Sequence, residues 1–561
     1  MKLIYNALSR WPDYARLEGA VAGGALPAAV TGLSGIHKCC VIASLCQKTG
    51  RRALVLAADE AEAQRFCEDL RALGLRPLSY PLRDFGFRDA AGTSHEYERL
   101  RLEVLSKLEN GTCDCVVACV DAALQYTMGP QELQRRLYPL EAGAQMEIED
   151  LLSALVQCGY TREDQIEGPG QFSRRGGIVD FYSPSASAPV RVEFWGDEID
   201  SLSYFDIGSQ RRTDPVDQVT LAPCAEAIAE KPLALAAKIE KLAASLRGKN
   251  APKAKEILRS EAEKLKNGLR IGSLDKYISL LYPETATLLD YFPAEGSLLF
   301  FSEGNKLKER MRTTLWQWGE DLKSYLAEGV LCKGLDTYSG DWEYALGKAQ
   351  EVPTLFLDLF ARGSYEVPTR TLVNMNVKQL PVWGGSTQVL AEDLRPLLDL
   401  GRACVVLCGT RRAGESLTED LKRLGLPAGF LEDPSTAAAG TVTVTPGTLS
   451  AGMELPEANF ALISHGRMAE VRQKKRKRDK NSKEISSLSE LSPGDYVVHA
   501  THGIGLFEGI HKLEMNGVTK DYIKVRYAKN DTLYVPVTQL DLVSKYIGPV
   551  SYTHLRAHET G

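Results

Sequence analysis

The sequence lacks the features of several protein classes. No apolar run approaches the ~20 residues that a membrane-spanning helix needs, and the N-terminal residues do not form a secretory signal peptide. The net charge of −6 gives no overall electrostatic signature of a nucleic-acid-binding protein. These absences predict a cytoplasmic protein without a membrane partner.

A metal site of the zinc type is also missing from the sequence. The twelve cysteines never have Cys-x-x-Cys spacing, and several of them, such as Cys115 and Cys404, lie in apolar runs typical of strands. His499 and His502 have no further ligand types beside them, so structural roles are expected. We therefore predict buried, reduced thiols and no metal.

The first 120 residues alternate between strand and helix patterns. Apolar strands are predicted at 28–31, 53–57 and 115–120, and helices at 36–48, 60–73 and 98–109. Strands that alternate with helices indicate a parallel sheet of the α/β class. A chain of 561 residues is too long for one core, so three to five domains are expected.

The turn after the first strand resembles a nucleotide-binding phosphate loop that has lost its chemistry. A working loop reads G-x-x-x-x-G-K-[ST], and of that pattern Gly32 and Lys38 remain, with Gly35 between them. His37 replaces the glycine that lets the backbone approach the phosphates, and Cys39 replaces the hydroxyl that binds magnesium. We predict an inactive remnant.

The most informative stretch runs from residue 168 to residue 212 and predicts two antiparallel hairpins. Gly176-Gly177 indicates a bulge or a close backbone approach, and residues 196–198 form a turn between strands at 190–195 and 199–205. Alternation places Val190, Val192 and Phe194 on a core face.

The opposite face of the strand at 190–195 carries polar and aromatic side chains. Arg191, Glu193 and Trp195 share it, and Arg174 and Arg175 are available from the neighbouring hairpin. Tryptophan with arginine is the usual composition of a protein-binding hot spot. Alternatively, a neighbouring domain covers Trp195. The pattern favours neither interpretation.

Four further regions have recognisable patterns. A helix at 147–157 has an apolar stripe, residues 232–267 form a long helical stretch with a charged, solvated face, and 384–467 reads as a small α/β domain. Residues 472–483 are strongly basic. We interpret this run as a linker, while contact with the phosphate backbone of DNA is the alternative.

Residues 490–548 read as a compact all-β module. Five short strands are expected there, with a tight turn at 502–505 and a hairpin turn at Asn516-Gly517. Short strands in under sixty residues indicate an SH3-like barrel.

Residues 168–212 resemble the domain that UvrB shares with the bacterial transcription-repair coupling factors (Mfd), and with which both bind UvrA. The resemblance implies that Arg175, Arg191 and Trp195 contact UvrA. The family pattern has phenylalanine at the last position, so tryptophan keeps an aromatic anchor there.

Residues 277–293 also resemble UvrB, but the strand that follows ends in Ser302-Glu303 instead of an acidic magnesium-binding box. Glu303 remains while the metal-binding aspartate is absent. Residues 80–99 resemble UvrB too, yet they are too short for its long damage-probing hairpin. The resemblance implies a UvrB-like module without a working ATP site.

The module at 490–548 resembles the RNA polymerase interaction domain of the coupling factors and the CarD-type regulators. The resemblance implies that the polymerase β subunit is bound through an edge strand and an apolar contact near Leu513, with Ile510 and Met515 as neighbours. A small open barrel offers unpaired backbone groups for such pairing.

Together these resemblances imply a multidomain α/β chain, with a degenerate UvrB-like parallel-sheet domain, an inserted α+β UvrA-binding domain, a small α/β domain and an SH3-like, CarD-type barrel. The expected boundaries are 1–120 and 216–383 for the UvrB-like domain, 121–215, 384–467, a linker at 468–489, 490–548, and a non-native tail at 549–561.

The implied function is that of a monomeric scaffold in transcription-coupled nucleotide-excision repair, with UvrA and RNA polymerase as partners. The ATP- and magnesium-dependent translocase of full-length coupling factors is absent, so no catalytic activity and no cofactor are expected. The alternatives are a UvrB-like helicase with a divergent ATP site and a CarD-like regulator fused to another domain.

Overall fold

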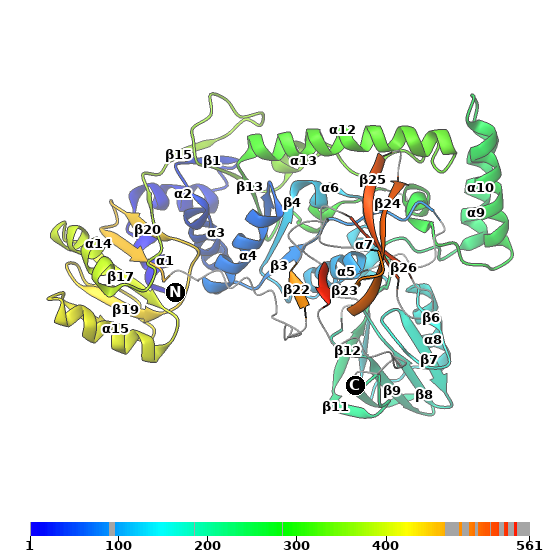
Figure 1. Ribbon diagram of the computed structural model, residues 1–561, viewed down its shortest axis with the longest axis horizontal. Helices are drawn as coiled ribbons and strands as arrows, with labels where there is room; N and C mark the ends of the chain where they lie inside the picture. Colours follow the sequence, from blue (N-terminus) through cyan, green and yellow to red (C-terminus); the bar gives the residue numbers. More distant parts are fainter. Residues whose placement is uncertain are drawn as a thin grey trace. The chain divides into compact units, whose positions relative to one another are not determined.

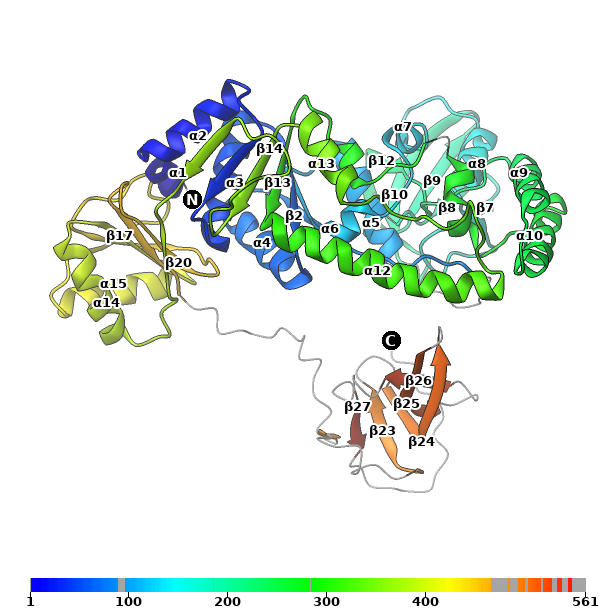
Figure 2. The same cartoon turned by 90° about the horizontal axis from the view of Figure 1, so that it is seen from above.

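The computed structural model describes most of the chain, namely residues 2–88, 96–184, 186–282, 284–465, 482–484, 493–499, 503–515, 518–526, 532–536 and 543–546. The chain divides into two compact units, Met1–Met468 and Ala469–Gly561. Figures 1 and 2 show both units, coloured along the sequence.

The first unit is built around a seven-stranded sheet in which every pair of neighbouring strands is parallel. Its strands, in spatial order, are β15 (Thr371–Asn374), β1 (Ala28–Thr31), β14 (Thr354–Asp358), β13 (Ser297–Ser302), β2 (Arg52–Ala57), β4 (Cys115–Cys119) and β3 (Pro77–Tyr80). The predicted parallel sheet is confirmed. Strand β1 lies between β14 and β15, and β13 pairs with β2, so the first 120 residues and residues 297–374 share one core.

Helices cover this sheet because its central strands are apolar on both faces. Every residue of β4 and β13 is buried. The covering helices are α1 (Lys2–Ser9), α2 (Pro12–Ala22), α3 (Gly35–Thr49), α4 (Glu60–Ala72), α5 (Glu96–Glu109), α6 (Val120–Leu124), α12 (Gly304–Glu328) and α13 (Trp342–Glu351). Figure 2 shows α12 as a long rod along this unit.

The second sheet of this unit has six strands and is antiparallel except for the pair β6–β7. In spatial order its strands are β11 (Arg212–Val216), β10 (Glu198–Phe205), β9 (Val190–Trp195), β8 (Ile178–Phe181), β7 (Gln171–Arg175) and β6 (Thr161–Arg162). Helix α8 (Ile148–Gln157) packs on one face through Leu151 and Leu155, whereas Val156 from the predicted stripe is exposed. Beside it, β5 (Tyr138–Glu141) pairs with β12 (Gln218–Leu221).

The stretch predicted to be one helical segment at 232–267 is instead two helices. Helix α9 (Pro232–Ser245) and helix α10 (Ala251–Lys266) are separated by a loop in which Gly248 has a φ of 105°. Few residues other than glycine adopt this backbone conformation, so the chain turns there. Short helices η1 (Leu274–Tyr277), α11 (Ile278–Leu281) and η2 (Leu288–Tyr291) lead back to β13, and α7 (Pro130–Gln134) precedes β5.

A third sheet follows the parallel one. Its spatial order is β16 (Lys378–Leu380), β20 (Gly452–Leu455), β21 (Phe460–Ile463), β17 (Ala403–Cys408), β19 (Val442–Pro446) and β18 (Ala428–Phe430). Helices α14 (Thr387–Asp399) and α15 (Arg411–Arg423) cover one face. Met453 and Leu455 from the other face share the main core with α3, so α3 is buried from Ile36 to Cys46.

The second unit contains an antiparallel sheet with the spatial order β22 (Ser482–Glu484), β27 (Val543–Tyr546), β23 (Tyr496–His499), β24 (Gly503–Met515), β25 (Val518–Arg526) and β26 (Thr532–Pro536). The tight turn predicted at 502–505 is wrong, because Gly503 and Gly505 lie inside β24 and pair with His499 and Val497. Residues 506–510 and 512–515, expected as two of the five short strands, are likewise parts of one strand. Residues 516–517 lie outside the described part, and closure into a barrel stays a prediction.

Membrane insertion finds no support in the described part of the chain, where no helix is long and apolar enough to cross a bilayer. The described residues also contain no group of three or more His, Cys, Asp or Glu side chains that could hold a metal ion. All twelve cysteines are free thiols, and eleven of them are buried.

Candidate functional site

The candidate site is the face of the antiparallel sheet that α8 does not cover. We call it the β7–β9 face, and its main side chains are Arg175, Arg191 and Trp195. Strand β9 lies between β8 and β10, with Asp180 opposite Arg191 and Ile178 opposite Glu193. Val190 and Val192 are buried and Phe194 packs against the same core. The predicted alternation is therefore confirmed, and the other side chains of β9 point away from that core.

Trp195 is the most exposed large apolar side chain on this face. It stands at the end of β9, before the turn at Gly196, and 84% of its surface is accessible. No described part of the first unit covers it. The alternative that a neighbouring domain covers Trp195 stays a prediction. An exposed tryptophan in a sheet otherwise well packed favours a contact with another molecule.

Arg191 is held by three neighbours. Its Nε and Nη2 each donate to one carboxylate oxygen of Asp180 at 2.8 Å, and its Nη1 donates to the carbonyl oxygen of Gln210 at 3.3 Å. The guanidinium carbon lies 4.8 Å from the centre of the Phe205 ring. Only 14% of the Arg191 side chain and 3% of the Asp180 side chain are exposed, and these hydrogen bonds raise the pKa of Arg191.

Arg175 differs from Arg191 in its surroundings. It is exposed at the end of β7, and within the described residues its side chain has no hydrogen bond or ion pair. The turn that follows contains Gly176, with a φ of 61°, and Gly177, where a Cβ would lie 3.2 Å from the carbonyl oxygen of Phe194. The predicted close backbone approach is confirmed, and it is part of a hairpin turn.

Sequence reasoning missed Asp180 and Phe205 as members of this surface. Asp180 lies in an otherwise apolar strand, Ile178–Phe181, and a carboxylate there signals a buried partner. The partner is identifiable only once the register of β8 against β9 is known. Glu193 forms a further ion pair with Arg212 of β11 on the same face.

The phosphate-loop remnant has its polar groups paired internally. Lys38, 2% exposed, donates from Nζ to Oε1 of Glu303 at 2.6 Å and to Oγ of Ser302 at 3.1 Å. The backbone N–H of Gly32 donates to the carbonyl oxygen of Leu359, and that of Leu33 to Asp358. A Cβ at Gly32 would lie 2.1 Å from the carbonyl oxygen of Met375.

The two substituted positions of this loop are buried. His37 is 2% exposed, its Nδ1 lies 2.7 Å from Oγ of Ser34, and burial lowers its pKa to about 4. Cys39 is fully buried, and burial raises the pKa of its thiol well above the ordinary value. Gly35 begins α3, with open space around it. These residues do not fit ATP and magnesium, because Lys38 and the N–H groups of Gly32 and Leu33 already have partners and Cys39 offers no hydroxyl.

The polymerase-binding candidates lie on the C-terminal half of β24. Ile510 is 47% exposed, Leu513 pairs with Lys520, and Met515 pairs with Val518 of β25. Strand β23 pairs only with residues 503–506 of β24. Phe507 exchanges backbone hydrogen bonds with Gly494 and Asp495 on that edge. In the described residues, the same edge of β24 is unpaired from 508 onward, which is the geometry that strand addition uses.

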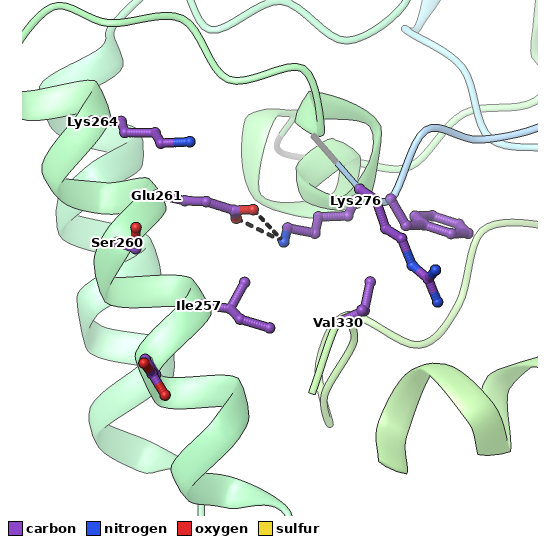
Figure 3. A pocket seen from close by; sticks show the side chains of 9 residues that line it. Ile257, Ser260, Glu261, Lys264, Lys276 and Val330 are labelled. Atoms are coloured by element: carbon purple, nitrogen blue, oxygen red, sulfur yellow. Dashed lines mark hydrogen bonds and ion pairs between the residues drawn. The ribbon is translucent and has the colours of Figure 1, made fainter. Parts of the chain in front are cut away.

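A hollow of about 380 Å³ lies between α10, η1 and the segments that follow β3 and α12 (Figure 3). Its charged walls compensate each other. Lys276 points at Glu261, with Nζ 2.7 Å from Oε2, and Glu261 also accepts from Ser273 and Tyr277. Arg88 pairs with Glu328 at 2.5 Å. This hollow therefore offers less to a charged ligand than the β7–β9 face does.

A buried ion network attaches the antiparallel sheet to the parallel one. Arg101 contacts Glu226 at 2.7 Å, Arg83 contacts Glu226 at 3.2 Å and Asp275 at 2.9 Å, and the backbone N–H of Glu226 donates to Glu98. Arg101 and Glu226 are fully buried. Four separate segments meet there, so the network fixes where the chain leaves the antiparallel sheet.

Comparison with known proteins agrees with this geometry. The UvrB interaction domain family matches residues 138–226, and the CarD-like/TRCF RID domain family matches residues 491–547. A transcription-repair-coupling factor of Bacillus subtilis is 32% identical over 98% of this chain. The resemblance to the transcription-repair-coupling factors is confirmed. Those of Staphylococcus epidermidis and Staphylococcus haemolyticus are 28% and 27% identical over 92% of the chain.

The chain spans about half the length of the curated relatives that it matches, namely 47% of the Bacillus protein and 45% of both Staphylococcus transcription-repair-coupling factors. The UvrB interaction match contains the whole β7–β9 face, and the RID match contains β23 to β27. The basic run at 472–483 lies outside the described residues except for its last two positions, which belong to β22.

Proposed function

We propose that this chain is a two-ended binding scaffold for transcription-coupled nucleotide-excision repair. One end recruits UvrA through the β7–β9 face, and the other binds the β subunit of RNA polymerase through β24. The observation that carries the proposal is Trp195, 84% exposed beside Arg175 and Arg191 within the matched UvrB interaction domain. The same chain also carries a match to the RID domain.

Translocation on DNA and ATP hydrolysis belong, in this proposal, to residues of the longer proteins that this chain does not contain. The internal pairing of Lys38 with Glu303 and of the loop amides with Leu359 and Asp358 supports that assignment. The same pairing disfavours a UvrB-like helicase with a divergent ATP site. The basic run at 472–483 is proposed as a linker whose contact with DNA is incidental.

The test is a binding assay with purified UvrA and purified RNA polymerase. Trp195→Ala is expected to lose UvrA and keep polymerase, and Leu513→Arg to lose polymerase and keep UvrA. Trp195 is a better probe than Arg191, because Arg191→Ala would also leave the buried Asp180 without its partner.

The matched control is Trp316→Ala, since Trp316 is an exposed tryptophan (65%) on α12, outside both candidate surfaces. This variant is expected to bind UvrA and RNA polymerase like the unaltered chain. Failure of the unaltered chain to bind either partner at micromolar concentration would overturn the proposal. Loss of UvrA binding in Trp316→Ala would show that UvrA does not bind at the β7–β9 face alone.

A further inference from the structure

The two arginines of the β7–β9 face have different electrostatic states. Arg175 is exposed and, among the described residues, has no ion-pair partner. Arg191 is neutralised by Asp180 through two parallel charge-assisted hydrogen bonds. A carboxylate approaching Arg191 would meet a charge that is already compensated, whereas one approaching Arg175 would not.

The guanidinium of Arg191 nevertheless keeps bonding capacity. Arginine has five N–H donors in a planar fork, and the contacts with Asp180 and Gln210 use three of them. Two donors, one on Nη1 and one on Nη2, are not used by any described residue. The side chain is 14% exposed, so it is not sealed from a partner molecule.

Three features hold that fork in one orientation. Asp180 accepts from Nε and Nη2, the Phe205 ring lies against the guanidinium group, and the carbonyl of Gln210 accepts from Nη1. Gln210 itself has a φ of 58°, a conformation that non-glycine residues keep only where the surroundings hold it. Its side chain bonds the carbonyl of Ile207 at 2.7 Å, which fixes the turn after β10.

We propose that Asp180 is a positioning residue that presents the remaining N–H groups of Arg191 to a neutral acceptor of UvrA, such as a backbone carbonyl, while Arg175 attracts the acidic groups of that partner. This inference rests on the proposed UvrA contact of the β7–β9 face. On one surface, Arg191 is then a fixed hydrogen-bond donor and Arg175 is a group that steers the partner electrostatically. Asp180, 2% exposed, acts only through Arg191.

The distinction has a kinetic signature. A charge at the rim of an interface changes the association rate and its salt dependence, whereas a buried, hydrogen-bonded pair changes the dissociation rate. Between about 50 and 300 mM salt, screening of an exposed charge increases strongly, and a held hydrogen bond is affected much less.

The experiment measures association and dissociation rates of the full chain with UvrA across that salt range. Arg175→Gln is expected to slow association and to flatten its salt dependence. Asp180→Asn and Arg191→Lys are each expected to weaken binding about tenfold or more, equivalent to about 1.4 kcal/mol, through faster dissociation. Arg191→Lys should retain the salt dependence of association, and Asp180→Asn, which leaves the charge of Arg191 uncompensated, should not flatten it. Arg191→Lys keeps the charge and the fold while losing the fork.

Wild-type dissociation rates in both Asp180→Asn and Arg191→Lys would overturn the inference, as would equal flattening of the salt dependence in all three variants. If Asp180→Asn does not fold, as judged by its thermal unfolding, Arg191→Lys alone decides. The proposed function fails separately, by absence of UvrA binding in the unaltered chain or by full binding of Trp195→Ala, and either result overturns this inference as well.

Discussion

The phosphate-loop remnant and the β7–β9 face both carry cationic side chains where a ligand could bind, but these side chains differ in burial and in internal pairing. In the remnant, Lys38 is buried and paired with Glu303, and the N–H groups of Gly32 and Leu33 donate to backbone carbonyls. On the face, Arg175 and Trp195 are exposed. A recognisable sequence motif therefore does not identify a binding site unless its hydrogen-bonding groups are available to a ligand.

The difference follows from packing. Helix α3 lies between the parallel sheet and the third sheet, and its residues from Ile36 to Cys46 are buried. A cation in that position needs an internal partner, because burying it alone costs several kcal/mol. Among the described residues, the core covers Val190 and Val192 on one face of β9, whereas Trp195 on the other face is exposed and available to a partner molecule.

The largest expected effect is on stability and comes from breaking the internal pair of the remnant. Lys38→Met leaves Glu303 partly buried without its cation and should lower the free energy of unfolding by about 3 kcal/mol. Chemical denaturation of the first unit measures it. Adding Glu303→Gln should recover part of the loss, and a neutral effect of Lys38→Met would contradict the assigned pairing.

The next largest effect is on the open face. Trp195→Ala should weaken UvrA binding by about 2 kcal/mol or more, the range of an interface hot spot, while the thermal unfolding midpoint stays unchanged. Titration calorimetry with UvrA measures the affinity. Equal weakening of UvrA binding by Trp316→Ala would contradict the assignment of Trp195 as a UvrA-binding residue.

A smaller effect concerns pH and the buried histidine of the remnant. The folded-state pKa of His37 is about 4, below the ordinary value of about 6.5, so the unfolded chain binds more protons between these two values. Stability contributed by neutral His37 is therefore present above about pH 6.5 and is lost as the pH falls toward 4, by about 2 kcal/mol at pH 5.

His37→Gln removes this titration. Its unfolding midpoint should depend less on pH between 7 and 5 than that of the unaltered chain, and equal pH dependence of the two chains would contradict a neutral, buried His37. Thermal unfolding followed by circular dichroism at several pH values makes the comparison.

The last prediction is that a variant gains no ATP binding, and it tests most sharply the difference between the phosphate-loop remnant and the β7–β9 face. Restoring the motif with His37→Gly and Cys39→Ser should not restore ATP binding at millimolar concentration, because Lys38 stays paired with Glu303 and the N–H groups of Gly32 and Leu33 stay paired with backbone carbonyls. Fluorescent-nucleotide titration with magnesium measures it. Nucleotide binding by the double variant would show that the two substitutions alone had removed the site.

Much of the local structure was predictable because it depends on local patterns. The predicted bounds of β1 and β9 agree with the structure, since apolar residues and flanking turns define them. The stretch 232–267 was predicted as one segment because its composition stays helical across Gly248, where only the backbone conformation reveals the turn.

The site was predictable only in its exposed part. Trp195 and Arg191 share a face by simple alternation, whereas the Asp180 partner depends on strand register. The pair formed by Lys38 and Glu303 joins residues 265 positions apart, which no local pattern can indicate. UvrA and polymerase contacts remain predictions that only binding experiments address.

The most direct test of the central claim is a bridging assay with both partners. RNA polymerase is immobilised, and UvrA is added with and without this chain. The account predicts that UvrA is retained only when the chain is present, and that Trp195→Ala and Leu513→Arg each abolish retention while Trp316→Ala does not. Retention of UvrA without the chain, or its absence with the unaltered chain, would contradict a two-ended scaffold.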